Sequence, residues 1–233
     1  MKKQLPLGLV TAVGIAASNL AAASDVYLKG GVGWAQNEGE TATVGDLGAP
    51  PDRVMFESDD SIAYHLGVGY RLAEWLDTEL SLNQVDGFDL SGPYENDGNP
   101  SGEIGRTEVD TTSVIILGLV NLSAVLDASW PVEPYVGLGA GYARHDMARF
   151  NITNDSATIN SDTSGGFAWK VLLGATYPVS EHMSLDASYA YTDYGEAKSS
   201  LAAYERGGAL QLNSPLTVDI RSHELSLSLR YRL

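Results

Sequence analysis

Side chains that commonly carry acid–base or nucleophilic chemistry are sparse in this chain. It has four histidines and no cysteine, so it offers neither a thiolate nucleophile nor a thiolate metal site. A serine-type hydrolase needs a hydroxyl, a histidine and an acid that converge on one point. His223 and Glu224 are neighbours on a predicted strand and point to opposite faces. His182 falls in a predicted turn, and His145 with Asp146 has no evident nucleophile beside it. The chain is therefore expected to have no catalytic residues, no metal site and no cofactor.

Acidic residues dominate the charge and gather in two segments. The formal net charge is −16, which argues against nucleic acid as a partner, because phosphates need Lys and Arg. Residues 37–60 hold seven acids against Arg53, and residues 86–108 hold six against Arg106. The acids are Glu38, Glu40, Asp46, Asp52, Glu57, Asp59, Asp60, Asp86, Asp89, Glu95, Asp97, Glu103 and Glu108. They could form a solvated repulsive surface, a divalent-cation bridge to an anionic surface, or a site for a basic ligand. The stretch 95–99 lacks the spacing of a calcium loop.

A further group of charged residues alternates with apolar ones along short segments. Its members share their faces with Gly, Ala and Ser. They are Lys29, His65, Arg71, Asp77, Glu79, Lys170, Asp186, Glu224, Arg230 and Arg232. Both signs of charge are present, so these side chains could pair wherever the fold brings them together.

The N-terminus has the features of a secretory signal peptide. Lys2 and Lys3 precede a short apolar run, and Ala21 to Ala23 offer small residues for cleavage. The predicted organisation is a signal peptide over residues 1–23 and one domain over 24–233.

The elements that must position the charged residues are predicted to be strands. Apolar residues alternate with small or polar ones with a period of two, which scatters them around a helix but aligns them on a strand. The predicted strands cover 26–34, 61–71, 76–83, 111–125, 134–144, 166–177, 182–193 and 223–233. The strand over 111–125 is apolar on both faces, so its inward side is not assigned.

The connections between these strands alternate between long and short. The long ones cover roughly 36–60, 86–108, 146–165 and 194–217, and the short ones lie near 73–74, 127–133 and 178–182. Short turns on one side and long loops on the other are typical of an antiparallel up-and-down transmembrane β-barrel. The fold class predicted is therefore all-β, with eight strands.

The two faces of the strands favour a membrane barrel over a soluble β-sandwich. One face carries bulky Leu, Val, Trp and Tyr, and the other carries Gly, Ala, Ser and charges. Eight strands enclose little volume, so the small and polar residues fit the lumen and the bulky ones need lipid. The charged lumen residues then form either a salt-bridged plug or a gate whose pairs exchange partners to pass small ions. The plug is favoured, because the lumen has room mainly for side chains.

The closing strand resembles the terminal signature of bacterial outer-membrane proteins. Leu225, Leu227, Leu229 and Tyr231 match its alternating apolar pattern, and Leu233 departs from it, since Phe is the usual last residue. The stretches "PYVGLGAGYAR" and "SLDASYAYTDYG" are similar to the opacity-type and OmpA- and OmpX-like eight-stranded barrels. The resemblance implies insertion by the barrel-assembly machinery and contact with outer-membrane lipid and lipopolysaccharide.

The expected function is non-enzymatic. We expect a structural or surface-interaction role, such as adhesion or ligand contact, in which the acidic loops meet a host or environmental ligand. The alternative is a narrow porin for small ions or solutes.

Overall fold

The computed structural model describes residues 25–38, 41–44, 52–96, 99–128, 130–153, 157–205 and 208–233. The signal peptide predicted over residues 1–23 lies outside the described residues. Within these ranges, no helix combines the length and the apolar character that crossing a membrane requires.

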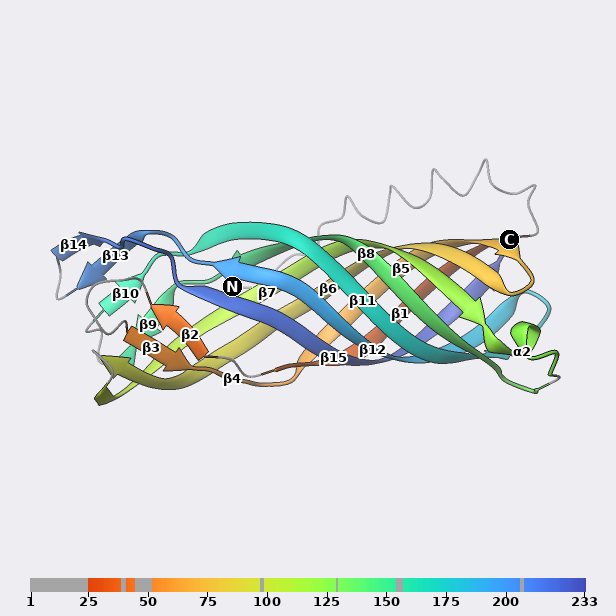
Figure 1. Ribbon diagram of the computed structural model, residues 1–233, viewed down its shortest axis with the longest axis horizontal. Coiled ribbons are helices and arrows are strands. Elements are labelled where there is room, and N and C mark those ends of the chain that lie inside the picture. The colour runs from red at the N-terminus through yellow and green to blue at the C-terminus, as the bar shows by residue number, and fades with distance from the viewer. Residues whose placement is uncertain are drawn as a thin grey trace.

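Eight long antiparallel strands form a closed ring (Figure 1). They are β1 (Val26–Asn37), β5 (Ser61–Ala73), β6 (Leu76–Asn96), β7 (Asn99–Asn121), β8 (Glu133–Met147), β11 (Asp162–Pro178), β12 (Met183–Lys198) and β15 (Thr217–Arg232). Each long strand pairs with the next one in chain order. The ring closes where β1 pairs with β15, with Lys29 opposite Arg230 and Trp34 opposite Leu225. The predicted eight-stranded up-and-down barrel is confirmed.

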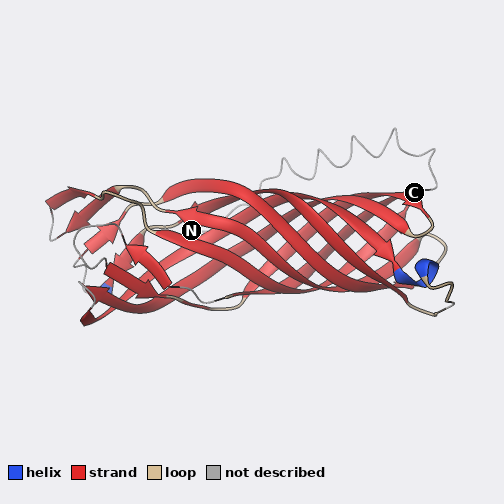
Figure 2. Ribbon diagram, viewed as in Figure 1, coloured by secondary structure: helices blue, strands red, loops and turns tan. Residues whose placement is uncertain are grey.

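The two ends of the barrel are built differently (Figure 2). One end, here called the turn end, carries short connections and the single-turn helix α2 (Leu122–Val125). The side chain of Asn121 caps this helix by accepting from Ser123 N and Ala124 N. The other end, here called the loop end, carries seven short strands within the described residues. They are β2 (Thr41–Val44), β3 (Asp52–Met55), β4 (Glu57–Ser58), β9 (Phe150–Ile152), β10 (Ala157–Ile159), β13 (Ala202–Glu205) and β14 (Gly208–Gln211).

The loop end is more ordered than the sequence predicts. Segment 86–108, expected to be a long loop, is a hairpin in which β6 and β7 stay paired out to Asn96 and Asn99. In the first connection, which joins β1 to β5, the hairpin β2–β3 pairs with β6 on one side and with β15 on the other. The connection from β8 to β11 contains β9, which pairs with β7, and β10. β10 pairs with β9 and with β13, which belongs to the connection from β12 to β15.

Two β-bulges explain why the alternating pattern ends earlier than strands β6 and β12 do. In β6 the register shifts between Val85 and Phe88, both of which are fully buried. Gly87 lies between them with φ +68°, a conformation that favours glycine. The extra residue reverses the phase of the alternation, so the pattern breaks at 86 although the strand continues. β12 has the same arrangement around Gly195, at φ +82°.

The predicted strand over 111–125 is too long at its C-terminal side. It ends at Asn121, and the next four residues form α2. Its inward side is now assigned: Ile115, Leu117 and Leu119 are buried, whereas Val114 and Ile116 are exposed on the outside of the barrel.

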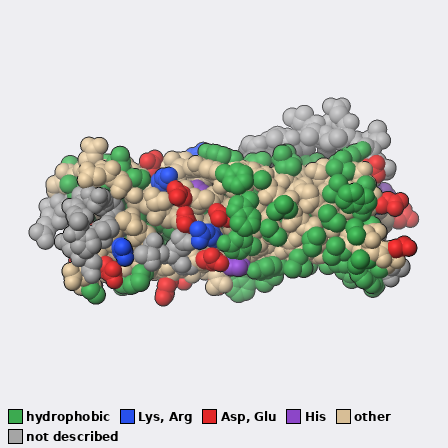
Figure 3. Space-filling model, in the orientation of Figure 1, with side chains coloured by type: hydrophobic (Ala, Val, Ile, Leu, Met, Phe, Trp, Pro, Cys, Tyr) green, Lys and Arg blue, Asp and Glu red, His purple; other side chains and the backbone are tan. Residues whose placement is uncertain are grey.

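On the face that Figure 3 shows, apolar side chains form a band on the outside of the barrel over the half nearer α2. Leu138 is 65% exposed, Leu225 62% and Ile116 64%. Exposure of large apolar side chains on this scale would be unfavourable in water, and it fits a wall in contact with hydrocarbon. Charged side chains begin where this band ends, toward the loop end (Figure 3).

Candidate functional site

The interior of the membrane-level barrel holds a network of opposite charges. Lys29 Nζ lies 2.8 Å from Asp186 Oδ1, and Lys170 Nζ lies 2.9 Å from Glu224 Oε2. All four side chains are buried. The Thr176 hydroxyl also donates to Asp186, at 3.0 Å. Each of these buried carboxylates therefore has both a cation and further hydrogen-bond donors.

A third acidic centre lies closer to the turn end. Asp77 pairs with two arginines: its Oδ2 lies 3.2 Å from Arg230 Nη1, and its Oδ1 lies 3.1 Å from Arg71 Nε. The guanidinium of Arg230 also stacks over the Tyr27 ring, with its Cζ 3.9 Å from the ring centroid. A cation over an aromatic face is attracted by the ring quadrupole, so Tyr27 holds this arginine in place.

The network is completed by three tyrosines that were not among the predicted lumen residues. The hydroxyl of Tyr27 donates to Glu79 at 3.0 Å, that of Tyr135 to Asp186 at 2.9 Å, and that of Tyr194 to Glu224 at 2.6 Å. The alternation along the strand could have revealed Tyr27 as a lumen residue, because it is two residues from Lys29 and therefore faces the same side. Glycines leave room for these rings: a Cβ on Gly69 would lie 2.0 Å from the Tyr27 ring.

The charges of the side chains that these ion pairs and hydrogen bonds connect are balanced. Four basic side chains face four acidic ones, and we call these eight residues the lumen network. They are Lys29, Arg71, Lys170 and Arg230 with Asp77, Glu79, Asp186 and Glu224. Neutralised and hydrogen-bonded charges can occupy a dry interior that isolated ions could not.

The two remaining predicted lumen residues lie differently. His65 faces the interior and shares a hydrogen bond with the hydroxyl of Ser228. Arg232, predicted to belong to the network, is instead exposed at the rim of the turn end. Its place in the alternation of β15 points it inward, but it is the last residue of that strand, where the interior opens to solvent.

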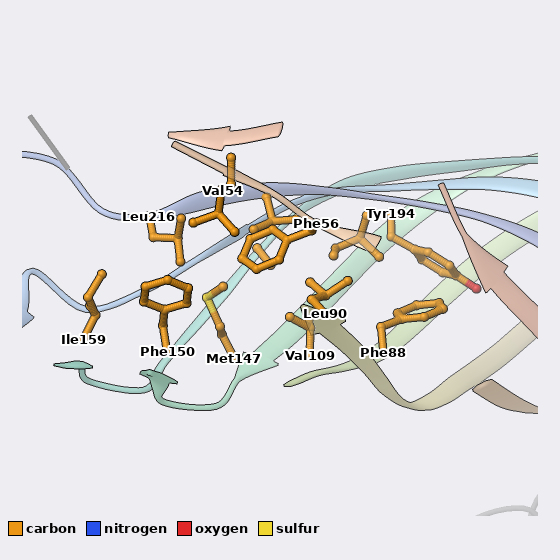
Figure 4. Close-up of a cluster of buried hydrophobic side chains, with 14 of the residues drawn as sticks. Val54, Phe56, Phe88, Leu90, Val109, Met147, Phe150, Ile159, Tyr194 and Leu216 are labelled. Atoms are coloured by element: carbon orange, nitrogen blue, oxygen red, sulfur yellow. The ribbon is translucent and has the colours of Figure 1, made fainter. Parts of the chain in front are cut away.

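Above the lumen network, toward the loop end, the interior becomes apolar (Figure 4). Phe88, Leu90, Val109, Met147, Phe150, Tyr194 and Leu216 are almost completely buried there, together with Val54 and Phe56 from the first connection. The rings of Phe56 and Phe150 meet edge to face with centroids 6.2 Å apart. We call this cluster the loop-end core. It lies inside the barrel between the lumen network and the loop end.

The acidic segments lie on the outside of the loop end. Glu57, Asp59 and Asp89 are exposed neighbours, since Asp59 N donates to the carbonyl of Asp89 at 3.2 Å and Glu57 pairs with Ser91. Some acids are engaged: Tyr94 donates to Asp52, and Glu38 pairs with His223. Glu40, Asp46 and Asp97 lie outside the described residues.

A concavity of about 520 Å³ opens on the same end. Its lining includes Glu108, Asp110, Asp146 and Asp162. Asp146 lies beyond the apolar band, where Thr163 donates to it at 2.6 Å and Arg144 at 3.1 Å. These hydrogen bonds, the one from Thr163 foremost, hold the pKa of the Asp146 carboxyl below its usual range.

His145 is fully buried and both of its ring nitrogens are engaged. Nε2 lies 3.0 Å from the carbonyl oxygen of Tyr194, so Nε2 donates the hydrogen bond. Nδ1 then accepts from the hydroxyl of Thr111, which is 3.0 Å away and also buried. This hydroxyl–histidine pair is closed to substrate, so it fits a structural role rather than a catalytic one.

The terminal strand presents its apolar residues to the outside. Leu225, Leu227, Leu229 and Tyr231 are between 43% and 62% exposed. Leu233 N donates to the carbonyl of Val26 at 3.0 Å, so the chain end stays attached to the first strand.

A closed ring of strands with an apolar outer band and a charged interior defines an integral β-barrel protein of the bacterial outer membrane. Residues 7–232 match the outer membrane protein beta-barrel domain, and the chain belongs to that family.

Relatives and solved structures are consistent with this family and fold. The chain is 25% identical over 149 residues to an uncharacterized protein of Brucella abortus, a match that covers 58% of this chain and 52% of the relative. The chain thus spans about half the length of the Brucella proteins that it matches. A Rickettsia canadensis protein described as a candidate adhesin is 24% identical, covering 76% of this chain and 77% of that one. The outer membrane protein OprG of Pseudomonas aeruginosa superposes with a TM-score of 0.57 at 15% identity, covering 91% and 97%.

Proposed function

We propose that the protein is a closed, non-catalytic barrel that presents an acidic surface at the outside of the cell for contact with a basic ligand. The observation that carries this proposal is the filling of the interior at two levels. The lumen network fills the membrane-level part, and the loop-end core fills the part above it. A barrel filled in this way has its chemically accessible groups on its outer surface and at its ends.

The loop-end core also supports the role of the loop end as a display surface. Long loops of outer-membrane barrels face the cell exterior. Here the short strands are packed on a common apolar core, so the exposed carboxylates are held on a folded platform above the apolar band. Clustered negative charge attracts basic partners and accelerates their association at low ionic strength. The candidate adhesin among the relatives is compatible with this role.

The remaining partners follow from the outer surface. The apolar band is proposed to contact the outer-membrane lipid and the acyl chains of lipopolysaccharide. The alternating Leu225, Leu227, Leu229 and Tyr231 are proposed as the assembly signature that the barrel-assembly machinery binds. Leu233 takes the position of the usual terminal Phe, so replacing it with Phe should leave assembly at least as efficient.

The surface role is tested by removing three negative charges either at the loop end or at the turn end. The test variant combines Glu57→Gln, Asp59→Asn and Asp89→Asn, all exposed at the loop end. The matched control combines Glu74→Gln, Asp127→Asn and Glu181→Gln, all exposed at the turn end. The measurement is retention of cells that display each protein on a poly-lysine surface at low and physiological salt.

We expect the loop-end variant to be retained several-fold less and the control to behave like the wild type, because only the loop end faces the surface. Equal retention of all three proteins would contradict the surface role.

Conduction is tested separately. In planar bilayers the purified protein should give no stable unitary current. Unitary currents that change when Lys170 is neutralised would instead support the narrow porin.

A further inference from the structure

The turn end of the lumen gathers three arginines from two strands that are not neighbours in the ring. Arg71 comes from β5, and Arg230 and Arg232 come from β15, with β1 between them. Together with Asp25 and Tyr27 they line a cavity of about 60 Å³. We propose that this arginine mouth binds a single oxyanion, the carboxylate or phosphate group of a molecule in the periplasm. This site is separate from the acidic surface at the other end of the barrel.

The first support is the sharing of one carboxylate by two arginines. Asp77 receives Nε of Arg71 on one oxygen and Nη1 of Arg230 on the other. A guanidinium has five N–H donors in a rigid fork, so a single carboxylate leaves donors on both arginines for another acceptor.

The second support is the charge around the cavity. Its lining carries three arginines against the one carboxylate of Asp25. Asp77 and Glu133, which line the adjoining cavity together with Arg71 and Arg230, bring the count to three positive and three negative charges. The described hydrogen bond that Glu133 accepts comes from Asn121, and the one that Glu79 accepts deeper in the lumen comes from Tyr27, so both of these donors are uncharged. The guanidinium N–H donors of the mouth are therefore only partly used by the described carboxylates around them.

The third support is that the arginines are held at different depths. Arg230 is buried and is fixed over the Tyr27 ring. The side chain of Arg71 is 30% exposed, and Arg232 is exposed at the rim. This gradation suits an anion that enters from solvent and is held against a fixed inner guanidinium. Guanidinium groups match the geometry of carboxylates and phosphates, and such charge-assisted hydrogen bonds are among the stronger ones.

The site is tested by titrating the full mature protein in detergent micelles. The probes are inorganic phosphate and N-acetylalanine, which represent the two sources of an oxyanion, at ionic strength held constant with chloride. The readout is the NMR shift of the arginine side-chain N–H groups. The variants are Arg232→Gln and Arg71→Gln, and the matched control is Arg144→Gln. Arg144 is an exposed arginine at the loop end that is paired with Asp146 in the way that Arg71 is paired with Asp77.

We expect saturable shifts in the wild type with at least one probe, and about tenfold weaker binding in Arg232→Gln, since one charge-assisted donor is lost. The control should bind like the wild type. Whichever probe saturates identifies the source, and saturation by both supports a general oxyanion site. Should Arg71→Gln not fold, as judged by heat-modifiable migration on a gel, the exposed Arg232 variant decides. Absence of saturation with either probe, or equal weakening in Arg144→Gln, would overturn the proposal.

Discussion

Along β6, the interior of the barrel at membrane level and the interior at the loop end have opposite chemistry. At membrane level the inward side chains of this strand are polar or charged, as in Glu79, and Leu80 is an example of its apolar outward ones. Farther along the same strand Phe88 and Leu90 are buried inside, and Asp89 is exposed outside. The strand therefore changes from an inside-out arrangement to the arrangement of a water-soluble barrel.

This difference follows from what surrounds the wall. Where hydrocarbon covers the outside, polar residues can only be placed inward, and they must neutralise one another. Where water covers the outside, burying apolar side chains inside becomes favourable. β15 shows the same reversal, with Glu224 inward below and Ile220 inward above. The point of reversal marks the outer edge of the lipid-facing band.

Neutralising one buried lysine of the lumen network should have the largest effect on the free energy of unfolding. Lys170→Met leaves Glu224 as an uncompensated buried charge, which typically costs about 3–5 kcal/mol of unfolding free energy. The matched control is Lys198→Met at the loop end, whose exposed pair with Glu196 contributes about 0–1 kcal/mol. Urea unfolding from lipid vesicles, followed by tryptophan fluorescence, measures both values. Equal stability of the two variants would show that the lumen network does not hold the barrel together.

Truncating the loop-end core should have a somewhat smaller and more local effect. Leu90→Ala removes a side chain that is 1% exposed and should cost about 3 kcal/mol. Limited proteolysis should cut the loop end faster while the membrane-level strands stay protected. Leu201→Ala, at a position 39% exposed, should change the cutting rate little. If both variants were cut like the wild type, the loop end would not depend on its apolar core.

Changing a bulge glycine should have the smallest of the three effects. Gly87→Ala forces a side chain into φ +68° and should cost about 1–2 kcal/mol. Gly166→Ala, where a Cβ meets nothing within 4 Å, is the control and should change stability by less than about 0.5 kcal/mol. Urea unfolding again gives the difference. A Gly87 variant no less stable than the control would argue against a strained bulge at the point of reversal.

The barrel itself could be predicted from the sequence, because a period of two persists through each membrane-level strand. Lys29, Asp77 and Lys170 could be assigned inward for the same reason. The partners within the lumen network could not, since pairs such as Lys170 and Glu224 depend on how the ring closes. Tyr27 was missed because a tyrosine suits both an interfacial girdle and a buried hydrogen bond.

The loop end was underestimated for a specific physical reason. The alternation changes phase at Gly87 and Gly195, and a phase change resembles the end of a strand when only the pattern is considered. Glycine at such a break, followed by a new alternation such as Phe88, Asp89, Leu90, is the signal of a bulge with a continuing strand. The inward side of segment 111–125 could not be assigned because its inward residues are apolar too: Ile115, Leu117 and Leu119 cluster with Leu172 inside the barrel.

The central claim is the reversal of the two faces along one strand, and site-directed spin labelling tests it most directly. The chain has no cysteine, so single cysteines can be introduced at Leu80, Leu82, Asp89 and Ser91 without background labelling. All four side chains point outward, so labels at these positions leave the interior unchanged. Labels at Leu80 and Leu82 should be accessible to oxygen in lipid, and labels at Asp89 and Ser91 to a water-soluble relaxation agent. A label at Asp89 that reports lipid, or one at Leu80 that reports water, would contradict the account.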